Sequence, residues 1–325
     1  MTARHSIWNP LEYLDKTVIN KHNAVMEARV KASSVFTEDE SFPLSVRRVE
    51  DHEDCGVHSH EFHELVVILA GRGRHITERK ASPLEAGDVF LIRGNMRHGY
   101  GDMDGMTLVN ILFDPRRLRL PMAFLRDLPG YHALFRVDPQ MKAHERVRSR
   151  LRLSEEELAE AAGMIVRLQQ EMARRKPGYR FLACTHLMAL IGFLSRCYAH
   201  ASRHADRPLL RMGEVLSHIE QNCAEPITIR QLTRIAHMSE STLMRTFRRV
   251  LGRSPIEHVI RVRIQRAAEM LQQGDVRVTE AAFKCGFSDS NYFSRQFRKV
   301  MRTSPRVYRA RHRDPAWRAP ARRPA

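Results

Sequence analysis

The chain has 325 residues, which is room for about two domains with a core each. Its formal net charge of +17 is uneven: residues 201–325 hold 25 Lys and Arg against 11 Asp and Glu, a net of +14 that leaves +3 for residues 1–200. A local basic excess favours a nucleic-acid partner. No basic amphipathic helix with an exposed aromatic face is evident, so a membrane partner is not expected.

The five cysteines are odd in number and widely spaced, and no two form a Cys-x-x-Cys pair: Cys55, Cys184, Cys197, Cys223 and Cys285. This spacing argues against a disulfide framework or a zinc ribbon and fits a reducing compartment. The sequence also shows no apolar leader and predicts no segment long enough to cross a bilayer. A cytoplasmic protein is therefore expected.

Residues 1–40 carry no clear pattern, and we expect an N-terminal extension without an assigned function. From 41 to 153 the sequence changes to short alternating apolar runs broken by glycine, such as 64–70, 73–77, 88–93 and 106–113. This spacing predicts a small antiparallel barrel or sandwich, with a turn at Gly71 between the runs 64–70 and 73–77.

A histidine-rich segment lies within these runs. In an extended strand, His58, His60 and Glu64 share one face with Phe62, whereas His63 points the other way. A second segment, 87–98, brings His98 from a different strand. Imidazoles and a carboxylate on an inner barrel face could bind Fe, Mn, Ni or Zn in open coordination. The same groups could instead hydrogen-bond a ligand or one another.

These two segments resemble the cupin barrel. His58, His60 and Glu64 match its first motif, and His98 matches the histidine of its second. The second match is partial, because Arg93 and Asn95 replace the usual proline and glycine and Asp102 replaces the final asparagine. The resemblance implies a barrel with an internal pocket. Any bound metal would be held by the four matching side chains.

Residues 154–201 predict two helices. Ser154 and Glu157 form a capping box for the first, which ends at 176–178. The second, 179–201, has more apolar residues than one face requires, including Leu182, Leu187, Leu190, Ile191 and Leu194. This surplus is consistent with a dimer contact or with packing against the barrel. The polar residues 202–208 read as a linker between domains.

Residues 209–312 contain one helical pattern twice. Phe247, Val250, Ser254 and Pro255 recur 50 residues later as Phe297, Val300, Ser304 and Pro305. Each copy predicts a short helix, a turn and a second helix; the expected N-caps are Thr228, Ser239 and Ser288, and Gly286 is expected in the second turn. A connecting helix, 255–271, joins the copies and fixes their spacing.

The outward positions of each second helix carry small hydrogen-bonding groups followed by arginines. Such a surface is typical of a helix that lies in the DNA major groove, although a pair of helical hairpins without a partner would share the apolar pattern. The predicted DNA-binding residues are Ser241, Met244, Arg245, Arg248, Ser290, Asn291, Ser294, Arg295 and Arg298.

The run 286–299, followed by Ser304-Pro305 and Tyr308-Arg309, resembles the signature of the AraC/XylS family of transcription regulators over about 100 residues. The resemblance implies base or phosphate contacts from both second helices. Arg302 departs from the pattern, since it stands where the family has a helix-ending glycine, which the first copy keeps as Gly252.

Together, the resemblances imply an α+β architecture: a cupin-like barrel at 41–153, a helical segment at 154–201 that is expected to dimerise, an all-α double helix-turn-helix domain at 209–312, and a disordered basic tail at 313–325. The implied partners are promoter DNA, RNA polymerase, a second copy of the chain and a small effector. The arrangement resembles the activators of L-rhamnose operons, which favours a sugar. The expected effector-binding residues are His58, His60, Glu64, Arg72, Arg74 and His98, joined by His75 and Asn110.

Regulators of this kind imply a barrel with no metal or other cofactor and no catalytic residues, so an activator rather than an enzyme is expected. Two alternatives remain open. One is a metal-dependent enzyme, such as a dioxygenase or sugar isomerase, fused to a DNA-binding domain. The other is a DNA-binding dimer that responds to no ligand.

Overall fold

The computed structural model describes residues 28–37, 39–78, 80–118, 120–137, 150–201, 208–273 and 276–313. The chain forms two units, Met1–Gly213 and Glu214–Ala325. Most of the expected extension, nearly all of the expected linker and almost the whole basic tail lie outside the described residues. The part of the extension that is described is built into the first unit, because the strand β1 (Ala28–Val30) pairs in parallel with β3 (Cys55–His60).

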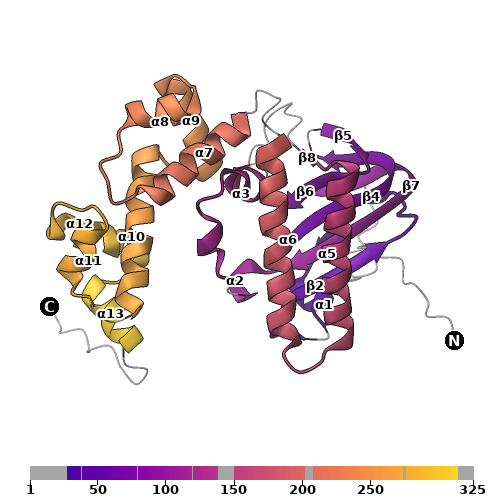
Figure 1. Ribbon diagram of the computed structural model, residues 1–325, viewed down its shortest axis with the longest axis horizontal. Helices are drawn as coiled ribbons and strands as arrows, with labels where there is room; N and C mark the ends of the chain where they lie inside the picture. Colours follow the sequence, from indigo (N-terminus) through magenta and orange to yellow (C-terminus); the bar gives the residue numbers. More distant parts are fainter. Residues whose placement is uncertain are drawn as a thin grey trace, which may run out of the picture. The chain divides into compact units, whose positions relative to one another are not determined.

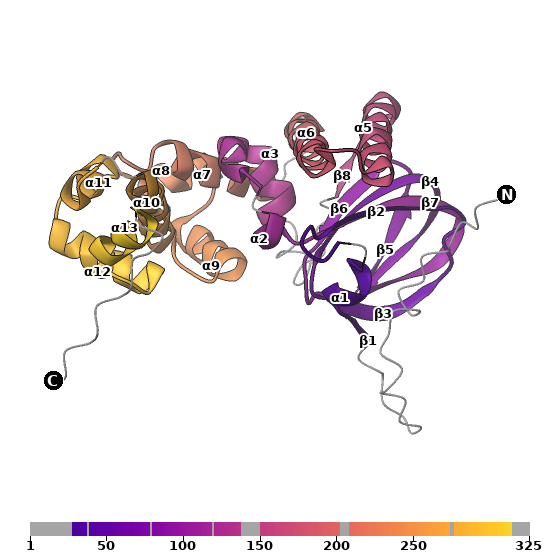
Figure 2. The same ribbon diagram turned by 90° about the horizontal axis from the view of Figure 1, so that it is seen from below.

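One sheet forms the core of the first unit. Its strands follow the order β1-β3-β7-β4-β6-β8, with β2 paired to β7 and β5 paired to β4. The sheet curves around an enclosed side, as Figure 2 shows. The remaining strands are β2 (Leu44–Val49), β4 (His63–Thr77), β5 (Lys80–Glu85), β6 (Asp88–Ile92), β7 (His98–Phe113) and β8 (Leu151–Arg152).

The strand β4 runs through the position where the sequence predicts a turn. It continues for 15 residues from His63 to Thr77, and Gly71 forms an irregularity inside it with φ of +82°. A Cβ atom at Gly71 would lie 2.3 Å from the carbonyl oxygen of Gly105 on β7, so the close approach of the two strands requires glycine. The pairing register between β4 and β7 shifts around this point.

The sheet is buried on both faces, which explains the continuous apolar runs of its central strands. Val66, Ile68, Phe90 and Leu108 point to the enclosed side. The alternate residues of the same strands belong to a second cluster that includes the helices α5 (Glu155–Arg174) and α6 (Tyr179–Ala201). These two helices lie side by side over the outer face (Figures 1 and 2).

The predicted capping box of α5 is confirmed: Ser154 accepts a hydrogen bond from the Glu157 backbone, and the Glu157 side chain accepts one from the Ser154 backbone. α6 is apolar around most of its circumference. By length and composition its residues Tyr179–His200 could cross a membrane, contrary to the expectation from sequence, but half of that stretch is buried inside the protein. Short helical segments complete the unit: α1 (Ala32–Val35), α2 (Pro115–Leu118), η2 (Met122–Leu125), α3 (Pro129–Tyr131) and η3 (His132–Val137).

The second unit is helical, and α7 (Pro208–Gln221) leads into it. The expected repeat is present as α8 (Ile229–Ala236) with α9 (Glu240–Leu251), and α11 (Val278–Lys284) with α12 (Ser290–Met301). The expected N-caps Thr228 and Ser239 are confirmed. The cap of α12 is Asp289 rather than Ser288, because the Asp289 carboxylate accepts a hydrogen bond from the backbone N–H of Asn291. The unit is completed by α10 (Pro255–Gln273) and α13 (Pro305–Arg313).

An arginine on α10 joins the two helical repeats. The Arg263 guanidinium donates hydrogen bonds to the carbonyl oxygens of Cys223 at 2.6 Å, Gly286 at 2.7 Å and Glu225 at 2.8 Å. Cys223 and Glu225 follow α7, whereas Gly286 forms the turn between α11 and α12. A single side chain therefore ties the loop before the first repeat to the turn of the second.

Candidate functional site

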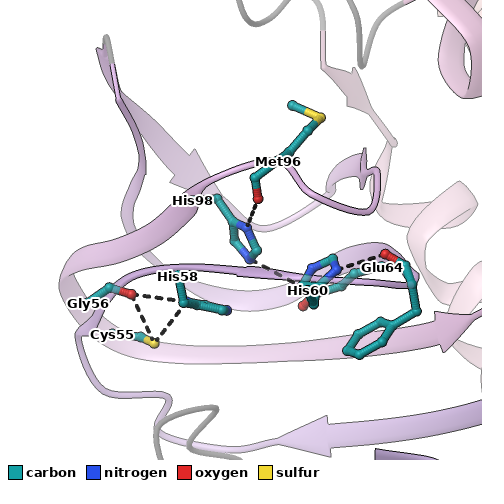
Figure 3. Close-up of polar contacts among 8 residues, drawn as sticks. Cys55, Gly56, His58, His60, Glu64, Met96 and His98 are labelled. Atoms are coloured by element: carbon teal, nitrogen blue, oxygen red, sulfur yellow. Dashed lines mark hydrogen bonds and ion pairs between the residues drawn. The ribbon is translucent and has the colours of Figure 1, made fainter. Parts of the chain in front are cut away.

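Four ionisable side chains meet inside the barrel. His58 and His60 end β3, Glu64 lies near the start of β4, and His98 begins β7. Antiparallel pairing places His58 opposite His98. All four are at most 4% exposed. Figure 3 shows His60, Glu64 and His98 pointing toward one another, although they come from three strands.

The predicted alternation of side chains is confirmed, even though the strand breaks at 61–62. His58, His60 and Glu64 lie on the enclosed side with Phe62, whose ring stacks on the His60 ring at 4.4 Å between centroids. His63 faces the other way and packs against Phe113 of the outer cluster at 5.8 Å.

The carboxylate of Glu64 is the centre of the group. Its Oε2 atom lies 3.0 Å from Nε2 of His60 and 3.6 Å from Nε2 of His98. One nitrogen or oxygen from each of these three residues falls within 4.8 Å of the others. His58 lies beside this group, with its ring centroid 4.3 Å from that of His98.

Each of these histidines is oriented by its backbone. The Nδ1 atoms of His58, His60 and His98 lie 3.0, 2.8 and 3.1 Å from the carbonyl oxygens of Gly56, Phe62 and Met96 (Figure 3). A carbonyl oxygen only accepts hydrogen bonds, so Nδ1 carries the proton in all three rings. A neutral ring then presents the lone pair of Nε2.

Burial and neighbouring side chains determine the protonation of His58 and Glu64. Burial, together with the neighbouring His98, lowers the pKa of His58 to about 4, so His58 is neutral near pH 7. Burial alone would raise the pKa of Glu64, but its interactions with the His60 and His98 rings outweigh burial and hold the pKa well below its ordinary value. The site therefore contains a buried carboxylate.

Further polar groups line the same interior. Tyr100 and Asn110 on β7 are at most 4% exposed, as is His75 on β4. The Tyr100 hydroxyl and the Asn110 Oδ1 atom have no hydrogen-bond partner among the described residues. A buried polar atom without a partner costs free energy, and a polar ligand is one way to satisfy it. Sequence reasoning missed Tyr100, although it lies two residues from His98 and thus on the same face.

The structure does not bring Arg72 and Arg74 to this cluster. Their side chains are 78% and 52% exposed and bind Asp104 and Asp102 on the neighbouring strand, at 2.8 and 3.1 Å. His75, which directly follows Arg74, is buried instead, and its ring lies 6.0 Å from that of His98. The polar side chains that line this part of the interior are instead His75, Tyr100 and Asn110.

The two second helices of the repeat present the predicted DNA-binding residues to solvent. Leu243 and Phe247 of α9 and Phe293 and Phe297 of α12 are buried, which turns the opposite faces outward. Six of the nine predicted residues are exposed, including all four arginines, and three are half-buried. The exposed residues are Ser241, Arg245, Arg248, Asn291, Arg295 and Arg298, and the half-buried ones are Met244, Ser290 and Ser294.

The four arginines of these faces are available for an anionic partner. Arg245, Arg248, Arg295 and Arg298 form no ion pair with a carboxylate in the part of the chain that the structure describes. Arg295 lies over the ring of Tyr292, 5.9 Å from its centroid. Guanidinium groups without a carboxylate partner are suited to phosphate oxygens and guanine edges.

Comparison with known proteins identifies both domains. Residues 44–191 match the AraC-like ligand binding domain, and residues 232–311 match a helix-turn-helix domain. The transcriptional activator RhaR of Mannheimia succiniciproducens is 26% identical over 278 residues, which are 86% of this chain and 95% of that protein. RhaR of Klebsiella pneumoniae is 29% identical over 291 residues, which are 88% and 100% of the two chains.

Among solved structures, an AraC-type transcriptional regulator from Chromobacterium violaceum is 29% identical, with a TM-score of 0.31; the match covers 33% of this chain and 95% of that one. The two matched domains together span most of the sequence, in the order in which the barrel and the helical repeats occur. The chain belongs to the AraC family of transcription regulators.

Proposed function

We propose that this protein is a sugar-responsive transcription activator that binds promoter DNA through α9 and α12. The observation that carries the proposal is the set of exposed arginines on both helices, which have no carboxylate partner among the described residues. They lie in the part of the chain that holds most of its net positive charge. A pair of helix-turn-helix units with such faces can occupy two successive segments of the major groove.

The direct test uses DNA fragments selected from random sequence by the wild-type protein. Arg245→Ala and Arg295→Ala should each weaken binding to the selected fragment by about 1–3 kcal/mol and relax the preference at a few base positions. Arg306→Ala is the matched control, since it removes an exposed arginine from α13 in the same unit. Footprints of both helix variants that match those of wild type and control would refute the assignment.

The proposed effector is a small polyhydroxy compound bound inside the barrel. Tyr100, Asn110 and His58 offer neutral donors and acceptors, as recognition of hydroxyl groups requires. The relatives named transcriptional activator RhaR support a sensor rather than a catalytic barrel. A panel of monosaccharides and deoxy sugars should contain one that raises the melting temperature, because a ligand of the folded state stabilises it. Absence of any shift would favour a regulator that needs no effector.

The proposed activator function also includes a cellular compartment and an oligomeric state. We assign the protein to the cytoplasm, where promoter DNA and RNA polymerase are available. We also assign it a homodimeric state, because α5 and α6 expose large apolar side chains, among them Phe181 at 75%. Light scattering of the purified protein should give twice the mass of the chain, and Phe181→Glu should reduce it to one chain. A monomeric wild type at micromolar concentration would contradict this assignment.

A further inference from the structure

Two arginines lie together on the outer side of the sheet, away from the histidine–glutamate cluster. Arg93 follows β6, whose Leu91 belongs to the outer cluster, and Arg136 lies in η3. Nη2 of Arg93 donates a hydrogen bond to the carbonyl oxygen of Phe135 at 3.4 Å. We propose that Arg93 and Arg136 bind a phosphate group at a second ligand site, separate from the interior of the barrel.

The first argument is that Arg93 is a charge without a counter-ion. Its side chain is half-buried, and it forms no ion pair with a carboxylate in the described part of the chain. Its Nε atom is buried and has no hydrogen-bond partner among the same residues. Burial and the positive charge of Arg136 lower the pKa of Arg93, although a guanidinium group stays protonated. A buried charge costs free energy unless an opposite charge accompanies it, so an anion would remove this cost.

The second argument is the way in which His132 orients Arg136. Nε2 of His132 lies 2.7 Å from the carbonyl oxygen of Arg126, so Nε2 carries a proton. Burial and the nearby arginines lower the pKa of His132 to about 3, so the ring is neutral near pH 7. Its Nδ1 atom therefore accepts a hydrogen bond from Nη1 of Arg136 at 3.2 Å. A buried neutral ring thus holds the second guanidinium group close to the first.

The third argument is the chemistry of the surroundings. Burial, followed by the charge of Arg93, lowers the pKa of His63 to about 4, so this ring adds no charge near pH 7. The carboxylate that acts on His63, that of Asp114, accepts hydrogen bonds from the backbone N–H groups of Arg116 and Arg117 at 2.9 and 3.4 Å. A phosphate dianion matches two guanidinium groups in charge, and its oxygens accept their paired N–H groups.

The conformation of η3 also fits a binding site. It is a π-helix, a rare conformation that occurs often at functional sites. It contacts both β6 of the barrel and α6 of the helical layer. A phosphate group held by Arg93 and Arg136 would therefore fix η3 to the sheet and stabilise the first unit.

The test is thermal unfolding of the full chain in chloride buffer at constant ionic strength, with inorganic phosphate added in steps. Phosphate should raise the melting temperature of wild type along a saturating curve, because a ligand of the folded state stabilises it. Arg93→Met and Arg136→Met should each need at least about 10-fold more phosphate for the same rise, the loss expected for one hydrogen bond from a charged donor. Arg93→Lys, which keeps the charge but not the fork of N–H groups, should also bind more weakly, and it takes the place of Arg93→Met if that variant does not fold.

Two control variants locate the response. Arg167→Met removes an exposed arginine from α5 of the same unit and should respond to phosphate as wild type does. Arg245→Ala combined with Arg295→Ala removes arginines from the DNA-binding helices and should also respond as wild type does. The proposal is overturned if wild type shows no saturating rise, or if both Arg93→Met and Arg136→Met keep the wild-type response. It is equally overturned if the response disappears only in the double variant, because phosphate would then act on α9 and α12.

A second ligand distinguishes the two sources of a phosphate group. A monophosphorylated sugar is titrated beside inorganic phosphate under the same conditions. Equal midpoints of the two curves would assign free phosphate as the ligand. A lower midpoint for the sugar phosphate that is lost in Arg93→Met would assign a phosphorylated small molecule.

Discussion

Arg263→Met tests whether one side chain on α10 holds the two helical repeats together. The substitution keeps an unbranched apolar stem but removes all three hydrogen bonds to the carbonyl groups of Cys223, Glu225 and Gly286. Hydrogen bonds from a charged donor contribute about 1.5–3 kcal/mol each. Two of the three are partly buried, and the third is exposed. Taking about 1.5 kcal/mol for each partly buried bond gives a loss of about 3 kcal/mol.

The assay is urea unfolding of the full chain, followed by circular dichroism, with hydrogen exchange to assign the earlier transition to residues 214–325. Arg261→Met is the matched control: it removes the same charge from the same helix, at a side chain for which the structure describes no hydrogen bond. A loss of about 3 kcal/mol is a large part of the stability of a small domain. If the two variants agree within about 0.5 kcal/mol, the usual scatter of surface substitutions, then the reasoning about this clamp is wrong.

Three further predictions concern backbone and charge. Arg302 adopts φ of +58°, so Arg302→Gly should raise the unfolding free energy by about 1 kcal/mol, measured by the urea midpoint. Gly286→Ala should lower it by about 2 kcal/mol or more, since φ is +83° and the new Cβ would lie 2.4 Å from the Ala224 oxygen; an unchanged midpoint would contradict the geometry. Burial lowers the pKa of His132 to about 3, so the folded protein binds fewer protons than the unfolded chain and should lose stability as the pH falls from about 6.5 toward 3. His132→Gln should flatten that pH dependence, and an identical profile would exclude His132 as its source.

The inner cluster could be predicted because it depends on local alternation. His60 follows His58 by two positions and Glu64 follows His60 by four, so extended backbone places all three side chains on one face. His98 required a second strand, which its position at the start of an apolar run indicated. What the sequence does not contain is the pairing of His58 with His98, which brings the two rings to 4.3 Å.

Arg72 and Arg74 show where alternation fails. Counted in steps of two from Glu64, both arginines belong to the inner face. The register of β4 against β7 shifts three times between Ile68 and Arg74, and these irregularities turn His75 inward instead. A shift of one residue moves every following side chain to the opposite face of the sheet. Whether such a shift occurs depends on how the strand pairs with its neighbour. Gly71 was its only local signal, and a glycine in that place equally fits a turn.

The length of α10 has a consequence for the operator. Its 19 residues span about 28 Å, somewhat less than one turn of B-DNA at about 34 Å, and the helix contacts both α9 and α12. The two half-elements of a binding site must therefore keep a fixed rotational phase. Inserting about five base pairs between them would turn one half to the far side of the duplex. Inserting about ten base pairs would restore the rotational phase, but the two half-elements would then lie too far apart, because α10 is one continuous helix and cannot lengthen. We therefore expect the protein to recognise neither of the two altered binding sites.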